Sequence, residues 1–141
     1  MRHFPIFLDT AGRQVIVSGA GECAVAKLRL LLKTEATIVV YGDNAENIVR
    51  RWAQDGKLTL IERPLANGDA DGASMVYAAN EDDDEDARIA AIGHAAGALV
   101  NVVDDLEDSQ FITSAIVDRD PVTVAIGTEG AAPVLARRIK A

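Results

Sequence analysis

Short apolar runs alternate with longer amphipathic segments through the first hundred residues of the chain. The apolar runs have the length and the β-branched content of buried strands, and they lie at 15–17, 36–41, 58–61, 75–79 and 98–103. The segments between them repeat apolar residues at helical spacing, and they lie at 23–33, 44–54 and 81–96. Strands that alternate with helices in this way are typical of an α/β fold. The pattern therefore predicts a doubly wound, mostly parallel sheet.

Two local signals refine this pattern. Residues 4–8 are apolar and are followed by a turn-forming sequence at 10–13, so we expect a β-hairpin with the strand at 15–17. Asn80 precedes the third helix and is a suitable N-cap. The carboxylates of residues 81–86 favour the positive end of that helix.

The last quarter of the chain has a different rhythm. Apolar runs at 111–117 and 122–126 are separated only by a turn, which predicts a small β-hairpin, and a helix is expected at 133–140. We therefore divide the chain into a nucleotide-binding domain at 1–113 and the start of a dimerisation or substrate segment at 114–141. The apolar residues of this segment need burial, which favours a homodimer. We also expect that further chain, or a partner, completes the segment.

The first strand runs directly into a glycine turn. Gly19, Gly21 and Ala24 have the spacing G-x-G-x-x-A where strand passes into helix. In dinucleotide-binding turns the first glycine makes the bend, the second lets the backbone approach a pyrophosphate, and the third small residue lets helix and strand pack closely. The N–H groups of Glu22 and Cys23 would face the pyrophosphate at the positive end of the helix dipole. The turn predicts a Rossmann-like dinucleotide site.

Asp43 and Asn44 follow the second strand, near the offset from Gly19 at which an acidic residue meets the ribose hydroxyls. The carboxylate of Asp43 would repel a 2′-phosphate, so NAD is favoured over NADP. Asn44 is also a suitable cap for the next helix. Cys23 has two interpretations, a reactive thiol at a helix start or a small residue that fills space beside the cofactor, and we favour the second.

Asp104 follows the fifth strand. In open α/β sheets ligands lie outside the carboxyl ends of the strands, so this carboxylate would project toward the bound cofactor. It is placed to act as a catalytic base. The alternative is an aspartate that only bonds to backbone N–H groups at a loop start.

Composition narrows the choice of partners. A chain of 141 residues with a net charge of -8 and a pI near 4.6 is not expected to bind nucleic acid or an anionic membrane. No run approaches the roughly 20 apolar residues that span a bilayer. The single cysteine, Cys23, excludes an internal disulfide and suits the cytoplasm. His3 and His94 lack metal-ligand spacing, and we predict no metal site.

Six separated segments, in the same order, resemble the precorrin-2 dehydrogenase/sirohydrochlorin ferrochelatase module of sirohaem synthase. They are HFPIFLD at 3–9, the glycine turn with KLRLLL at 27–32, AANEDD at 78–83, NVVD at 101–104, FI at 111–112 and PVLAR at 133–137. The resemblance implies NAD-dependent oxidation of precorrin-2 to sirohydrochlorin, with ferrous iron insertion in bifunctional members, and a homodimer. It also supports Asp104 as the catalytic residue.

The substrate of that family is a tetrapyrrole rich in carboxylates, so an acidic protein must supply a local basic patch. The candidates are Arg119, Arg137, Arg138 and Lys140, with Thr128 as a polar contact. The second glycine turn reads Gly-Thr-Glu-Gly at 127–130, where family members commonly have Ser-Ser-Gly-Gly. A non-catalytic regulatory domain that binds NAD or a tetrapyrrole is therefore the alternative function.

Overall fold

The computed structural model describes residues 1–128 and 138 of the chain. They belong to two compact units, one formed by residues 9–110 and the other by residues 1–8 together with the chain from 111 onward. The larger unit contains β1 (Gln14–Ser18), α1 (Glu22–Leu31), β2 (Thr37–Tyr41), α2 (Asn47–Gln54), β3 (Thr59–Ile61), β4 (Ala73–Ala78), α3 (Asp83–Ala95) and β5 (Leu99–Val102). The smaller unit contains β6 (Ala115–Arg119) and β7 (Val122–Ile126).

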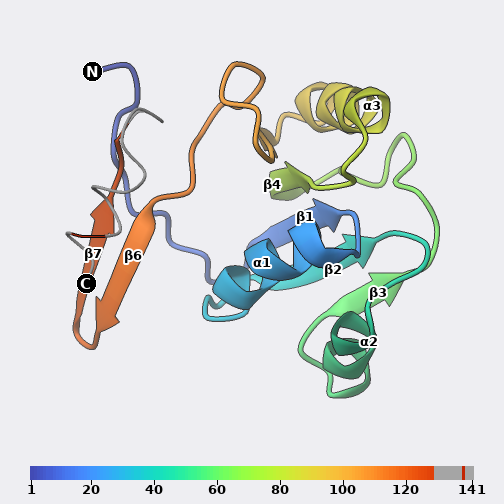
Figure 1. Ribbon diagram of the computed structural model, residues 1–141, viewed down its shortest axis with the longest axis horizontal. Coiled ribbons are helices and arrows are strands. Elements are labelled where there is room, and N and C mark those ends of the chain that lie inside the picture. Colours follow the sequence, from blue (N-terminus) through green and yellow to red (C-terminus); the bar gives the residue numbers. More distant parts are fainter. Residues whose placement is uncertain (129–137, 139–141) are drawn as a thin grey trace. The chain divides into compact units, whose positions relative to one another are not determined.

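The five strands of the larger unit form one parallel sheet in the order β3-β2-β1-β4-β5. Helices α1 and α2 lie on one face and α3 on the other, so the sheet is covered on both sides (Figure 1). Because both faces are covered, the middle of the central strand is apolar, and Val15, Ile16 and Val17 are each 0% exposed. The predicted α/β, Rossmann-like doubly wound sheet is confirmed.

The core on the α3 face collects alternate residues of the strands. Ile16, Val39 and Val76 pack with Ile89 and Ile92 of α3 in one buried cluster. On the other face, the guanidinium of Arg29 on α1 lies over the ring of Trp52 on α2, 5.5 Å from its centroid. Within the sheet, the strand order places β1 in the middle, between β2 and β4.

This central position explains why the predicted hairpin at residues 4–8 is wrong. Both edges of β1 are hydrogen-bonded, to β2 on one side and to β4 on the other, so no edge remains for an antiparallel partner. Residues 4–8 have no regular secondary structure, and Phe4 and Phe7 are 78% and 73% exposed. The turn at 10–13 is present, closed by Arg13 N–H donating to the Thr10 carbonyl at 3.1 Å.

Two predicted helix starts are also wrong. The N-cap of α3 is Asp82, whose carboxylate accepts from Glu85 N–H at 3.0 Å. Asn80 does not cap this helix. Helix α2 begins at Asn47, three residues after the predicted cap Asn44, which has a left-handed φ of 53°. The residues between Asn44 and α2 lie against the glycine turn, because Glu46 N–H donates to the Ala20 carbonyl at 2.9 Å.

The smaller unit contains the predicted hairpin. Strands β6 and β7 pair in antiparallel register from Ala115 opposite Ile126 to Arg119 opposite Val122, and Asp120 and Pro121 form the turn. The predicted helix at 133–140 lies outside the described residues, apart from position 138, which is helical. In the described part of the chain, no helix has the length and apolar character needed to cross a membrane.

Candidate functional site

The strand order changes direction between β1 and β4, and in open α/β sheets this is where ligands bind, beyond the carboxyl ends of the strands. The glycine turn lies at this point and is bonded to both neighbours. Gly19 N–H donates to the Tyr41 carbonyl at the end of β2, at 2.7 Å, and Ala79 N–H donates to the Ser18 carbonyl, at 2.8 Å. The turn therefore has a fixed position relative to the ends of three strands.

The two glycines of the turn have different constraints. Gly19 has φ +118°, and a Cβ built there would lie 2.1 Å from the carbonyl oxygen of Ala79, so only glycine fits. A Cβ on Gly21 would meet nothing within 4 Å. Gly42, after β2, also packs against the turn, because its Cβ would lie 3.1 Å from the Cβ of Ala20. Gly42 was not predicted as a site residue, and its one signal in the sequence is a glycine directly after a strand.

Helix α1 begins at Glu22, with Gly21 as its N-cap, and Val25 N–H makes the first helical bond, to the Gly21 carbonyl at 3.0 Å. The N–H groups of Glu22 and Cys23 precede that bond and have no partner within the helix. No side chain caps this end of α1. Open space over Gly21 and uncommitted N–H groups fit the pyrophosphate of a dinucleotide.

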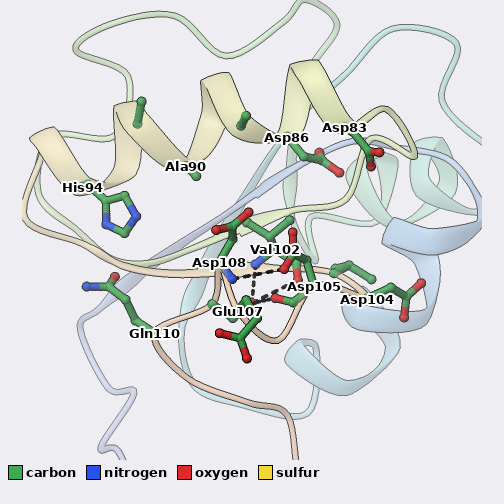
Figure 2. Close-up of a pocket in the computed structure, with 14 residues that line it drawn as sticks. Asp83, Asp86, Ala90, His94, Val102, Asp104, Asp105, Glu107, Asp108 and Gln110 are labelled. Atoms are coloured by element: carbon green, nitrogen blue, oxygen red, sulfur yellow. Dashed lines mark hydrogen bonds between the residues drawn. The ribbon is translucent and has the colours of Figure 1, made fainter. Parts of the chain in front are cut away.

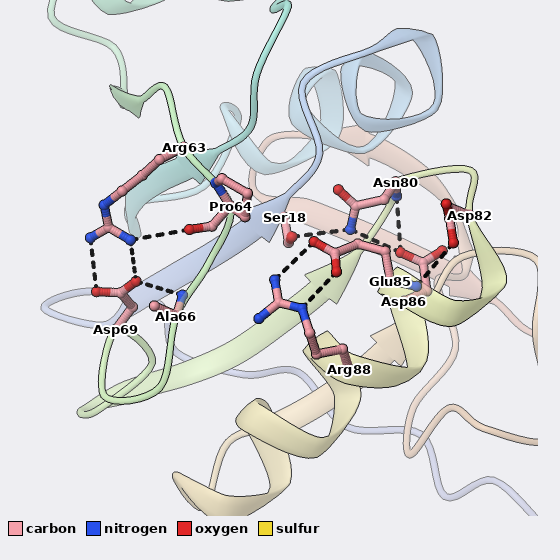
Figure 3. A network of polar contacts seen from close by, with 10 residues as sticks. All are labelled: Ser18, Arg63, Pro64, Ala66, Asp69, Asn80, Asp82, Glu85, Asp86 and Arg88. Carbon is pink, nitrogen blue, oxygen red and sulfur yellow. Dashed lines mark hydrogen bonds and ion pairs between the residues drawn. The ribbon is translucent and has the colours of Figure 1, made fainter.

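A buried polar network holds the turn after β4 beside the glycine turn (Figure 3). The Asn80 side-chain amide donates to Ser18 Oγ at 3.1 Å and to Asp86 Oδ1 at 2.9 Å, and Asn80 N–H donates to the same oxygen at 3.0 Å. Ser18 is 1% exposed and Asp86 is 6% exposed. This network is not predictable from the sequence, because no local spacing signals that Asn80 links strand β1 to helix α3.

Asp104 lies two residues after the end of β5 and has a left-handed φ of 63°. The turn around it is fixed by Asp105 N–H, which donates to the Val102 carbonyl at 3.0 Å. Ser109 is buried, and its hydroxyl accepts from Val102 N–H at 2.9 Å and donates to the Asp105 carbonyl at 2.6 Å. Gln110 bonds to the free edge of β5 at Val100. The loop thus holds Asp104 exposed at the carboxyl end of the sheet.

Electrostatics connects Asp104 with the start of α1. The pKa of the Cys23 thiol is raised, first by burial and then by the charges of Asp104 and Glu81, while Lys27 acts in the opposite direction. Both carboxylates thus act electrostatically on the thiol at the start of α1. The raised pKa disfavours a reactive thiolate and agrees with a small residue that fills space.

A cleft of about 790 Å³ opens beside Asp104, between α3 and the loop that follows β5 (Figure 2). Its lining is strongly acidic, with Asp83, Asp86, Asp104, Asp105, Glu107 and Asp108. The pKa of Asp108 is raised, chiefly by its hydrogen bond to Asp105 and by the charge of that residue. Among residues 1–128 and 138, no three His, Cys, Asp or Glu side chains are grouped so as to hold a metal ion.

The other predicted site residues lie in several places. Asp43 and Asn44 are exposed immediately after β2, at the same edge of the sheet as the glycine turn. Thr128 is half-buried in the smaller unit, just after β7. Arg137 lies outside the described residues.

The sheet and its glycine turn define the class of protein, a dinucleotide-binding α/β domain. Residues 6–115 match the family NAD_binding_7, described as "Putative NAD(P)-binding", and the chain belongs to this family.

Similar proteins with longer chains refine this assignment. A siroheme synthase of Pseudoalteromonas atlantica is 42% identical over 140 residues, and one of Chromobacterium violaceum is 39% identical over 141 residues. The matches cover 99% and 100% of this chain, which spans 30% of the length of each relative. The solved structure of SirC, a precorrin-2 dehydrogenase, matches 98% of this chain and 68% of its own, with a TM-score of 0.78 and 25% identity. The resemblance to the amino-terminal module of sirohaem synthase is confirmed.

The different constraints on the two glycines predict different outcomes for the same substitution. Gly21→Val has room and should leave the unfolding temperature near that of the parent, while weakening NAD binding by at least about tenfold, because the side chain occupies the pyrophosphate position. Gly19→Val should instead lower stability by at least about 2 kcal/mol through its clash with Ala79. Thermal unfolding and calorimetry check both. Normal NAD affinity in folded Gly21→Val would contradict the assignment of the turn.

Cys23 reports on the position of Asp104. Asp104→Asn removes a negative charge near the thiol, so the pKa of Cys23 should fall and the thiolate fraction at a given pH should rise. Because Cys23 is the single cysteine, alkylation by iodoacetamide followed by intact mass measures this directly. The midpoint of alkylation against pH should move downward in Asp104→Asn and stay in place in the control Asp55→Asn, at the end of α2. An unmoved midpoint in Asp104→Asn would place Asp104 away from α1.

Proposed function

We propose that this chain is an NAD-dependent precorrin-2 dehydrogenase module, which oxidises precorrin-2 to sirohydrochlorin in sirohaem biosynthesis in the cytoplasm. The observation that carries the proposal is the placement of Asp104, held in a left-handed turn at the end of β5 and close enough to the start of α1 to raise the pKa of Cys23. The likeness to siroheme synthases and to SirC supports the choice of substrate.

The cofactor is held by the residues around the glycine turn. The N–H groups of Glu22 and Cys23 bind the pyrophosphate, and the absence of a side chain on Gly21 lets it approach. Asp43 and Asn44, at the end of β2, receive the adenosine ribose, and the charge of Asp43 favours NAD over NADP. NAD supplies the hydride acceptor when it is bound.

Asp104 supplies the base. Loss of a hydride from a saturated ring carbon leaves a proton to be removed from the macrocycle, and an exposed carboxylate can accept this proton and release it to water. Ser109 keeps the base in place through its bonds to Val102 and Asp105. Ser109 thus acts on the reaction through the position of Asp104.

The substrate carries many carboxylates and requires cations. The cleft beside Asp104 is acidic and would repel them. We assign substrate binding to the carboxyl-terminal segment, with Thr128, Arg119 and Arg137 as the contacts. Ferrous iron insertion into sirohydrochlorin, with iron as its substrate, is a second candidate activity: the acidic lining near Asp104 attracts cations, but no three of the described carboxylates are grouped to bind one.

The smaller unit supports a homodimer. It exposes large apolar side chains, including Phe4 at 78%, Phe7 at 73%, Val122 at 59% and Val124 at 46%. Exposed apolar surface of this kind marks an interaction site. A second copy of the chain is the partner we propose.

Asp104→Asn tests the chemistry in the natural full-length protein. The amide keeps the shape but cannot accept the proton, so dehydrogenation should fall by about 10² or more while tetrapyrrole and NAD binding remain near normal. NADH formation measured by absorbance checks the rate. Asp83→Asn, in the same cleft, is the control and should keep the parental rate. Unchanged turnover in Asp104→Asn would remove its role as base, and a parent that binds NAD without turnover would favour the regulatory alternative.

Sedimentation velocity tests the assembly. The parent should sediment as a dimer at micromolar concentration, and Val124→Asp should shift it toward monomer, because a charge is then placed on the apolar surface. Ala125→Asp, the next residue of β7 on the opposite side of the strand, is the control and should remain dimeric. A parent that is monomeric at high micromolar concentration would contradict the proposal.

A further inference from the structure

Arg63 follows β3 and is engaged in a fork with Asp69 (Figure 3). One terminal nitrogen of its guanidinium donates to Asp69 Oδ2 at 2.6 Å and the other to Oδ1 at 3.1 Å. The first nitrogen also donates to the Pro64 carbonyl at 3.1 Å. Asp69 is itself fixed, because its Oδ2 accepts from Ala66 N–H at 2.7 Å. The guanidinium of Arg63 therefore donates three hydrogen bonds, all to residues of its own loop.

The pair lies at the edge of the sheet where β2 ends. Tyr41 is opposite Ile61 in the parallel register of β2 and β3, and Gly42 N–H donates to the Ile61 carbonyl at 3.1 Å. The guanidinium of Arg63 lies over the ring of Tyr41, 5.2 Å from its centroid. Asp43 comes two residues after Tyr41, just beyond the end of β2, and neighbouring strands of a sheet are spaced about 5 Å apart. Arg63 is thus beside the proposed adenosine end of the dinucleotide.

An arginine at this end of a dinucleotide site has a specific potential role. NADP differs from NAD by a phosphate on the adenosine ribose, and a guanidinium accommodates that phosphate with two parallel hydrogen bonds. Here the guanidinium already makes this bidentate contact with Asp69, and the pair shifts the pKa of Arg63 upward and that of Asp69 downward. Asp69 is the more buried partner, with 18% of its side chain exposed, against 48% for Arg63.

We propose that Asp69 is a residue that determines cofactor specificity, because it keeps Arg63 away from the 2′-phosphate of NADP and so makes the chain select NAD. The inference rests on the proposed NAD site and adds a second element to it. Asp43 repels the phosphate, and Asp69 neutralises and holds a cation that would otherwise attract it. The two carboxylates act on the same discrimination, Asp43 from just beyond the end of β2 and Asp69 from the loop between β3 and β4.

The test is Asp69→Asn in the full-length protein, with dissociation constants for NAD and NADP measured by calorimetry. Asparagine retains an oxygen for Ala66 N–H but loses the charge and the second acceptor for Arg63. NADP should bind Asp69→Asn about tenfold more tightly than it binds the parent, because the released guanidinium makes charge-assisted contacts with the 2′-phosphate. NAD affinity should change by less than about threefold. Asp69→Ser provides the same test if Asp69→Asn does not fold.

Two variants control the result. The chain has a second fork of similar geometry on α3, where Arg88 donates to the two oxygens of Glu85 at 2.6 and 2.8 Å, so Glu85→Gln releases an arginine elsewhere and should leave the NADP affinity unchanged. The double variant Arg63→Gln/Asp69→Asn should lose the gain. A parent that binds NADP as well as NAD, no gain in Asp69→Asn, or a gain retained without Arg63 would overturn the inference. A parent that binds neither nucleotide would instead overturn the proposed function.

Discussion

The backbone of Gly19 lies against the carbonyl of Ala79, so close that a Cβ would be 2.1 Å from the oxygen. The close contact arises because β1 is bonded on both edges, so its chain must leave the sheet between the ends of β2 and β4. The direction of α1, the open N–H groups at its start and the position of the turn after β4 all follow from it. A side chain at position 19 would separate β1 from β4, so the site and the core depend on the same packing.

Backbone strain is concentrated at this edge of the sheet. Among the described residues, the non-glycine residues with positive φ are Asn44, Glu81 and Asp104, and they follow β2, β4 and β5 within a few residues of each strand end. A residue other than glycine costs of order 1 kcal/mol or more in this conformation. The surrounding bonds compensate, because Asp86 holds the turn after β4 and Ser109 holds the turn after β5. Strained residues that are held so firmly are typical of binding and catalytic sites.

This edge of the sheet has two proposed functions, pyrophosphate binding and proton transfer, and a different source of charge serves each. In the proposed site, the backbone N–H groups at the start of α1 attract the pyrophosphate, so no basic side chain is needed there. The charges of Asp104 and Glu81 raise the pKa of Cys23, and carboxylates of this kind suit the proposed transfer of a proton. A protein with a net charge of -8 can thus bind an anionic cofactor, because the attraction comes from oriented backbone dipoles.

The sequence alone was sufficient for the alternation of strands and helices, the parallel sheet, the glycine turn and the hairpin at β6 and β7, because each is encoded in local periodicity and turn chemistry. It was insufficient for the position of residues 4–8, since their apolar pattern suits a strand but the partner edge is occupied by β4. Helix caps were misplaced for a similar reason: Asn80 donates to Ser18, 62 residues away in the chain, and to the Asp86 carboxylate, and Asp82 caps α3 in its place. Only the tertiary structure decided which residues support Asp104 and that Arg63 is held beside the end of β2, because bonds between distant segments leave no local signal.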